Sequence, residues 1–318
     1  MWNWIIRPID RLAMRSAMGS VCASPDGDPH LDEAAEFLNR PNFFVPETEP
    51  ANLQITAGDT FHFSSPVPSG CAENDLVRGR FFPTDGDWRK RPSMILLHGW
   101  NAELQYQWMF PFWGQLLARA GVNAFMFELP YHSSRKPRSR DAIRNFFSGD
   151  LLHVVRATHQ ALGDTRALAG WLYASGAPNV GVWGVSLGGW LSALAVSHQP
   201  EITNAVLLTP VVRMDRAFRD LPFCEPMRCG VNAAEQESFT PLNVISHRPL
   251  CDSRNVLVVA SRHDLFAPPE TLDELEQSWK PEVWRVNHGH ITVLLSTRIM
   301  RRIVKWAAAH TTTPTRTS

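Results

Sequence analysis

Residues 180–198 read VGVWGVSLGGWLSALAVSH, in which a short apolar run and a longer one are joined through a glycine-flanked serine. The run at 180–183 has the length and composition of a buried strand, and residues 188–198 those of a buried helix. Ser186 stands between them, with glycines two residues before and two residues after it. These glycines let neighbouring backbone pass a sharp strand-to-helix turn without a Cβ clash. The stretch therefore predicts an exposed serine hydroxyl beside a helix N-terminus.

The alternation of short apolar strands with helices continues along most of the chain. Uninterrupted apolar strands between helices are typical of a mostly parallel sheet that is covered on both faces. The sequence thus predicts an α/β protein with a doubly wound sheet of about eight strands, whose functional groups lie beyond the carboxyl ends of the strands. Strands are expected at residues 93–97, 122–127, 180–183, 205–208, 256–260 and 282–286, with an antiparallel edge pair at 52–63 and 77–82. Helices are expected at residues 108–120, 151–175, 188–198, 269–279 and 291–309.

The chain organisation predicted from this pattern is one large domain at residues 51–310. Residues 1–50 are expected to form an N-terminal helix and an irregular arm, with the helix packed on its own domain or on a partner rather than on a membrane. Residues 131–149 and 212–249 break the alternation and are possible lids. Residues 311–318 have the composition of a disordered tail.

Charge and cysteine usage restrict the classes of partner. Lys plus Arg and Asp plus Glu both number 31, so no overall field favours nucleic acid, and a small molecule is the expected partner. Charged residues interrupt the apolar N-terminal stretch before a membrane-spanning helix could form, which argues against stable membrane insertion and against a signal peptide. The five cysteines lack paired C-x-x-C spacing, so no metal site is predicted and a cytoplasmic protein with reduced thiols is expected. The basic run at 135–144 is interpreted as the solvated surface of a lid rather than an anion site.

With this pattern the chain resembles the α/β-hydrolase superfamily, from about residue 51 to its closing helix. The resemblance implies that Ser186 is a nucleophile, and the position of Leu187 at a helix N-terminus makes its N–H a donor to a developing oxyanion. The tripeptide His-Gly-Trp at 98–100 is similar to the His-Gly loop of the family. It implies that the N–H of Trp100 is the second oxyanion donor and that His98 braces the loop.

The other two members of a catalytic triad follow from the same resemblance. The family keeps Gly followed by the catalytic His after its last strand, which implies His290 as general base, with His288 as its rival. Asp264, just beyond the expected strand at 256–260, occupies the usual place of the acid that orients the histidine, and Asp215 is the substitute. The chain order Ser, Asp, His is the order of this fold.

The function that the resemblance implies is hydrolysis of a carboxylic ester through an acyl-enzyme, without a metal or an organic cofactor. An acyltransferase, a thioesterase or a peptidase on the same triad stays open, as does a non-catalytic binder on the hydrolase scaffold. Trp100, Trp108 and Trp190 are candidates for the wall of an apolar substrate pocket, and ordinary packing is the alternative for each.

Overall fold

The protein is described by a computed structural model. It describes residues 3–311 except 57, 102, 104, 140, 230, 233, 234 and 236. Of the predicted tail at 311–318, residues 312–318 lie outside the described residues. Thr311 is buried and forms the end of the last helix, so the tail was predicted to begin one residue too early.

In the described part of the chain, nine strands form one sheet in the order β1-β2-β3-β5-β4-β6-β7-β8-β9. The pairs from β1 to β5 are antiparallel, whereas β5, β4, β6, β7, β8 and β9 run parallel. The sheet has one strand more than predicted because residues 52–63 fold as a hairpin of two strands. The strands are β1 (Gln54–Ile55), β2 (Thr60–Ser64), β3 (Leu76–Phe82), β4 (Ser93–Leu97), β5 (Asn123–Phe127), β6 (Val180–Val185), β7 (Ile202–Leu208), β8 (Val256–Ser261) and β9 (Glu282–Val286).

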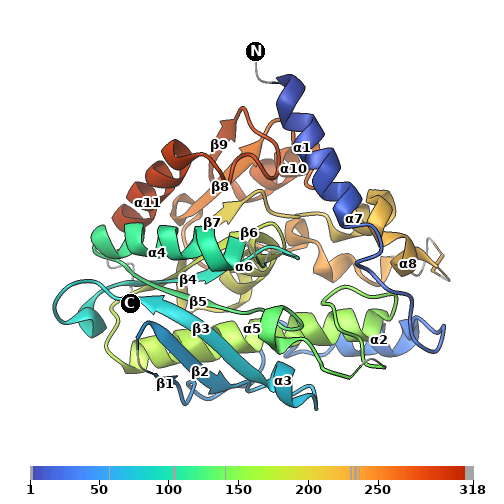
Figure 1. The fold of residues 1–318 in the computed structure, drawn as a ribbon, viewed down its shortest axis with the longest axis horizontal. Coiled ribbons are helices and arrows are strands. Elements are labelled where there is room, and N and C mark those ends of the chain that lie inside the picture. Colours follow the sequence, from blue (N-terminus) through green and yellow to red (C-terminus); the bar gives the residue numbers. More distant parts are fainter. Residues whose placement is uncertain are drawn as a thin grey trace.

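Helices cover both faces of this sheet, which confirms the predicted α/β-hydrolase architecture (Figure 1). Buried apolar residues of α4 and α11 pack on one face, and those of α5, α6 and α10 pack on the other. The strand at 93–97 contributes alternate side chains to the two cores, which explains its uninterrupted apolar sequence. The helices are α1 (Asn3–Ser16), α2 (Leu31–Leu38), α3 (Ala72–Asp75), α4 (Phe110–Arg119), α5 (Leu151–Ala174), α6 (Leu187–His198), α7 (Met214–Asp220), α8 (Glu225–Arg228), α10 (Pro269–Trp279) and α11 (Thr297–Thr311).

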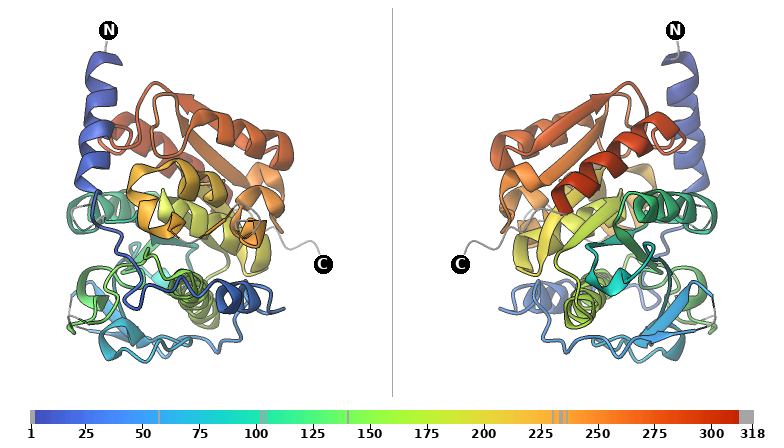
Figure 2. Two further views of the ribbon diagram at one scale, coloured as in Figure 1. Left: turned by 90° about the vertical axis from the view of Figure 1, so that its right-hand side faces the viewer. Right: turned by 90° about the vertical axis from the view of Figure 1, so that its left-hand side faces the viewer.

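The N-terminal helix α1 lies along the outside of the domain, next to the C-terminal elements (Figure 2). Ile6 and Asp10 of the helix are buried, as is Ala17 directly after it, whereas Leu12 is exposed. The helix therefore packs on its own domain, as one of the two sequence-based alternatives proposed. Among the residues that the structure describes, no helix is long and apolar enough to cross a membrane.

Two sequence-based expectations about local structure were wrong. The closing helix begins at Thr297 rather than at residue 291, and residues 291–295 form turns. The backbone N–H groups of His290 and Ile291 donate to a side chain of α1 instead of starting a helix. The interpretation of the basic run at 135–144 as solvated is wrong for Arg135, whose side chain is fully buried and pairs with Asp164 at 2.9 Å, whereas Arg138 and Arg144 are exposed.

Candidate active site

The register of the sheet brings the loops that carry the candidate residues together. Leu97 pairs with Gly184, so the carboxyl ends of β4 and β6 are level. Ser261 pairs with Val286, which aligns the ends of β8 and β9 in the same way. The carboxyl ends of parallel strands form a common edge. The loop at 98–100 packs near Ser186, the loop at 262–267 shares a cavity wall with it, and the loop at 287–296 lies against the loop at 262–267.

Ser186 occupies the turn between β6 and α6 with a φ of 53° and a ψ of −112°. This conformation is uncommon for a residue with a side chain and costs on the order of 1–3 kcal/mol. Its two flanking glycines are required sterically. A Cβ on Gly184 would overlap the carbonyl of Gly188, and a Cβ on Gly188 would overlap the carbonyl of Leu97. The close packing of glycine against backbone thus enforces the strained turn.

The two candidate oxyanion donors lie on either side of this turn. Leu187 is the first residue of α6, so its N–H belongs to the first turn and has no acceptor within the helix. Gly99, which precedes Trp100, lies close to Ser186, since a Cβ on Gly99 would be 3.6 Å from the Cβ of Ser186. The loop is braced by His98, whose Nδ1 lies 2.7 Å from the Gly99 carbonyl oxygen while its Nε2 accepts from Leu129 N. Burial lowers the pKa of His98 to about 4, so this ring is neutral.

His290 and Asp264 form a buried pair. The imidazole Nδ1 lies 2.8 Å from one carboxylate oxygen of Asp264 and 3.0 Å from the other. Burial by itself lowers the pKa of His290, but the charge and hydrogen bond of Asp264, with a further contribution from the charge of Asp10, raise it above its usual value. Asp264 is held in turn by the N–H groups of Phe266 and Ala267, each at 2.8 Å. Because Asp264 engages Nδ1, the other ring nitrogen of His290 is left for a substrate or a nucleophile.

The structure separates the two rivals from this pair. Among the described residues, the Nδ1 of the partly exposed His288 has no hydrogen-bond partner. Asp215 is bound by Arg213, with an oxygen-to-nitrogen distance of 2.6 Å, rather than by a histidine. Of the two candidate histidines and the two candidate acids, the fold thus brings together His290 and Asp264.

Asp10 of α1 is the residue of this site that the sequence did not reveal. Its side chain is fully buried, and its carboxylate accepts hydrogen bonds from His290 N at 2.8 Å and Ile291 N at 3.1 Å. In the sequence Asp10 lies among arginines on an amphipathic helix, where an acidic residue indicates a solvated face. No local motif marks it, because its partners lie 280 residues away.

A small apolar cavity of about 50 Å³ lies at Ser186. Of the three tryptophans predicted to line a substrate pocket, only Trp100 lines it. The prediction for Trp108 was wrong because that side chain is 74% exposed, and the prediction for Trp190 was wrong because it is buried and its Nε1 donates to the Leu242 carbonyl at 2.7 Å. The cavity is lined by Trp100, Phe147, Ser186, Leu187, Val211, Met214, Ala217, Phe218, Leu221, Phe223, Cys224 and Phe266.

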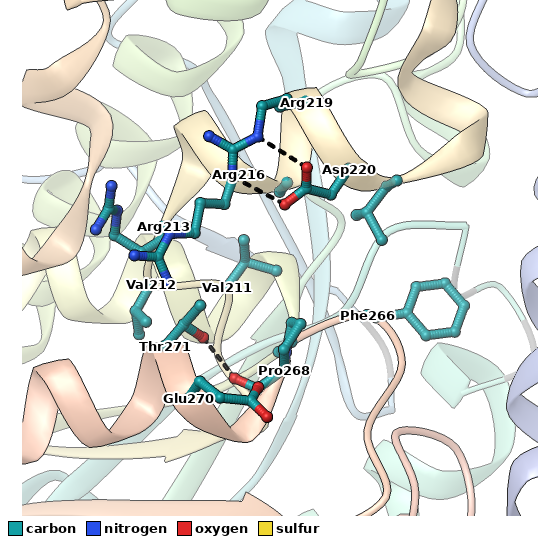
Figure 3. Close-up of a pocket in the computed structure, with 13 residues that line it drawn as sticks. Val211, Val212, Arg213, Arg216, Arg219, Asp220, Phe266, Pro268, Glu270 and Thr271 are labelled. Atoms are coloured by element: carbon teal, nitrogen blue, oxygen red, sulfur yellow. Dashed lines mark hydrogen bonds and ion pairs between the residues drawn. The ribbon is translucent and has the colours of Figure 1, made fainter.

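A larger cavity of about 480 Å³ adjoins this site and shares Val211, Ala217, Leu221 and Phe266 with the small one (Figure 3). Its wall combines apolar residues with polar side chains of both charges. The polar residues that line it are Arg213, Arg216, Arg219, Asp220, Glu270 and Thr271. Phe266 connects the two cavities with the candidate base, because its ring stacks on His290 with centroids 4.7 Å apart.

Solved structures of several esterases have a similar fold. An acetyl xylan esterase from Paenibacillus sp. R4 superposes with a TM-score of 0.56 at 14% identity, over 92% of this chain and 98% of that chain. Est1E from Butyrivibrio proteoclasticus with bound ferulic acid gives a TM-score of 0.54 at 14% identity, over 74% and 96%. An esterase from Pyrococcus furiosus gives 0.54 at 15% identity, over 83% and 100%. At this level of identity the likeness establishes the fold alone.

Among curated proteins, the chain is similar to the uncharacterised protein Rv2627c of Mycobacterium tuberculosis strain H37Rv. The two are 29% identical over 228 residues, which is 68% of this chain and 54% of that protein. The uncharacterised protein MT2702 of strain CDC 1551 matches with the same values. The chain therefore spans about half the length of the curated relatives it matches.

A family model identifies the protein family. Residues 62–226, just over half of the chain, match the family described as alpha/beta hydrolase domain containing 18. The match includes Ser186, its flanking glycines and the loop at 98–100, and it ends before Asp264 and His290. With the nine-stranded sheet and the strained serine turn, the match shows that this chain belongs to the alpha/beta hydrolase domain containing 18 family, within the α/β-hydrolase superfamily.

Proposed function

We propose that this protein is a serine hydrolase that cleaves carboxylic esters through an acyl-enzyme, with Ser186, His290 and Asp264 as its triad. The observation that carries the proposal is the buried pair of His290 and Asp264 beside a cavity that also holds Ser186. A buried ionisable pair next to a strained nucleophile in a cleft is typical of an acyl-transfer site rather than of structural packing.

The mechanism follows from this arrangement. His290 takes the proton of the Ser186 hydroxyl as the oxygen attacks the ester carbonyl carbon, and Asp264 stabilises the imidazolium that forms. The N–H groups of Leu187 and Trp100 donate to the oxyanion of the tetrahedral intermediate. Collapse of the intermediate breaks the bond to the alcohol oxygen, which receives the proton from His290. Water then repeats the sequence on the acyl-enzyme and releases the acid.

The size of the cavity at Ser186 supports a short acyl group. The apolar space of about 50 Å³ has room for only a few non-hydrogen atoms, since roughly 10–15 Å³ of such space holds one water molecule. The ring of Phe223 closes this space against Trp100, with ring centroids 4.9 Å apart. We therefore expect acetyl to butyryl esters to be cleaved with a higher kcat/KM than long-chain esters.

The larger cavity supports a polar alcohol on the leaving side. His290 must reach the leaving oxygen to protonate it, so the alcohol lies on the side of the site where Phe266 stacks on the imidazole. On that side the cavity of about 480 Å³ presents arginine, carboxylate and hydroxyl groups (Figure 3). The arginines are paired with neighbouring carboxylates, for example Arg219 with Asp220 at 2.8 Å, so the wall favours hydroxyl groups over a net anion.

The test is labelling by a fluorophosphonate probe of the wild type, Ser186→Ala and the surface control Ser139→Ala, with the modified residue located by mass spectrometry. We expect stoichiometric labelling at Ser186 in the wild type and the control, and none in Ser186→Ala. Absence of labelling of the folded wild type would contradict the proposal and favour a non-catalytic binder.

Turnover of matched substrates separates the reactions that share a triad. We expect hydrolysis of an acetyl oxygen ester to exceed that of the corresponding thioester and amide, and hydrolysis to exceed acyl transfer to added alcohol. Preference for the thioester, the amide or transfer would identify a thioesterase, a peptidase or an acyltransferase instead.

The cytoplasmic location is part of the same proposal. It is supported by the free state of all five cysteine thiols, since reducing compartments keep thiols unpaired. Fractionation of cells that express the protein, with thiol alkylation before lysis, tests it. We expect the protein in the cytoplasmic fraction with five alkylated cysteines.

A further inference from the structure

The helix α1 contacts the loop at residues 287–296, which carries His290. From these contacts we infer that Asp10 is a positioning residue for His290, so that α1 contributes to the active site. The inference rests on the proposed function of His290 as general base. It assigns a role to a segment that precedes the matched family region by some fifty residues.

The first support is the burial of a carboxylate where ordinary helix packing calls for an apolar side chain. Asp10 lies on the buried face of α1 with Ile6, and its side chain is fully inaccessible. Burying an ionised carboxylate is costly unless hydrogen bonds and charges compensate it. The groups that compensate it are the backbone N–H groups of His290 and Ile291 and the His290 imidazole itself. All of them belong to the loop that carries the base.

The second support is steric, and it comes from the opposite side of the contact. A Cβ on Gly289 would lie 2.7 Å from a carboxylate oxygen of Asp10. A side chain at this position could be accommodated only if the carboxylate of Asp10 moved away from the loop. The loop between β9 and α11 has no regular secondary structure at residues 287–296, so the two hydrogen bonds to Asp10 fix backbone that the sheet does not hold.

The third support is electrostatic. The charged groups that act on His290 are Asp264, from the loop after β8, and Asp10, from α1, and both raise the pKa of the imidazole. Asp264 binds the ring and Asp10 binds the backbone of the same residue. Together they orient the imidazole and stabilise the imidazolium that forms when Ser186 loses its proton.

The test compares Asp10→Asn and Asp10→Ala with Arg11→Gln, a charge-removing control at an exposed position of the same helix. Rates are counted per active site titrated with fluorophosphonate, so a variant that is only partly folded still gives an answer. We expect both Asp10 variants to lower kcat on the order of 10- to 100-fold with little change in KM, because the base is displaced from its productive geometry. Arg11→Gln keeps wild-type kcat.

The pH profile distinguishes positioning from a purely structural role. Only neutral His290 can accept the proton, so kcat/KM falls as the pH drops through the pKa of His290. Removing the charge of Asp10 lowers this pKa, and the acidic limb of the profile moves to lower pH in Asp10→Asn. Unchanged kcat per active site with an unmoved acidic limb would overturn the inference, whatever happens to the melting temperature.

A double-mutant cycle with Gly289→Ala tests the contact itself. Alone, Gly289→Ala should lower kcat because its Cβ pushes the carboxylate away from the loop. In the Asp10→Ala background the same change should cost several-fold less, since the obstructing carboxylate is gone. Additive effects would contradict the inference. If the wild type fails to label, the proposed function fails, and NMR titration of the His290 imidazole in wild type and Asp10→Asn still tests the coupling: an unmoved pKa contradicts it.

Discussion

At the residue scale, the proposed role of His290 as base depends on Asp264, which binds its imidazole ring. Asp264 bonds the Nδ1 of His290 with both oxygens and is itself fixed by two backbone N–H groups, so the imidazole presents its other nitrogen toward the site. The raised pKa of His290 is the electrostatic result of this contact. The sequence offered Asp215 as the substitute acid, and that residue is instead bound by Arg213.

The replacement Asp264→Asn should lower kcat on the order of 10⁴-fold, because an amide donor at Nδ1 favours the wrong imidazole tautomer. The charge that raises the pKa of His290 is lost as well, so the acidic limb of the residual activity should move to lower pH. Asp215→Asn is the matched control and should keep wild-type kcat per active site. Equal losses in the two variants, measured as pH profiles of ester hydrolysis, would mean that Asp264 is not the acid.

The small cavity at Ser186 gives a second prediction at this scale. Phe223→Ala should enlarge the space beside Ser186 and raise the ratio of octanoyl to acetyl ester kcat/KM by at least about tenfold, given 1–3 kcal/mol per methylene in a fitted pocket. The ratio does not depend on how much of the variant is folded. Phe112→Ala, at a partly exposed position of α4 outside the cavity, should leave it unchanged. An unchanged ratio in Phe223→Ala would place the acyl group elsewhere.

At the element scale, apolar periodicity predicted the strands and helices of the sheet well, including the bounds of β4 and α10, but not which way single side chains face. Trp108 and Trp190 both lie near a motif in the sequence, yet one points to solvent and the other into the core. Whether residues 131–149 and 212–249 are lids stays a prediction. The described parts of both contribute to the cavity wall, through Phe147 in the first and Phe223 in the second.

The segment at 131–149 is anchored by Arg135, which the sequence analysis interpreted as solvated. Arg135 is buried against Asp164 of α5, and its Nε also donates to the Asn74 carbonyl at 2.8 Å. Arg135→Ala should lower the free energy of unfolding by about 3–5 kcal/mol, because it leaves an uncompensated buried carboxylate. Arg138→Ala, whose side chain is 89% exposed, is the control and should change stability by less than about 0.5 kcal/mol. Similar urea midpoints for the two variants would show that the buried pair does not anchor the segment.

At the scale of the whole molecule, the sequence revealed those site residues that local motifs carry and missed the one that tertiary packing supplies. Ser186 and its glycines form a five-residue motif, and Asp264 and His290 follow strands that can be predicted from their apolar composition. Asp10 reaches its partners only because α1 returns across the fold to the histidine loop, and nothing in its neighbourhood predicts that contact. The strained backbone of Ser186 and the buried carboxylate of Asp10 are both costly to the stability of the fold, and such residues are typical of functional sites.

The burial of Asp10 leads to a prediction about the free energy of unfolding. Burial raises the pKa of Asp10, so its ionised form destabilises the folded state relative to its neutral form. Asparagine resembles the neutral acid. Asp10→Asn should therefore unfold at a higher urea concentration than the wild type at about pH 7, although we expect its kcat to be lower.

The sign of the pH dependence follows from linkage. A raised folded-state pKa contributes stability that is fully present below the unfolded-state value of 3.8 and is lost as the pH rises through the folded-state value. The stability advantage of Asp10→Asn should thus be largest near neutral pH and shrink as the pH falls toward 3.8. Arg11→Gln should follow the wild type throughout. If Asp10→Asn were less stable than the wild type at neutral pH, the hydrogen bonds of Asp10 would stabilise the fold more than its burial destabilises it. The burial of Asp10 would then no longer support a role in positioning His290.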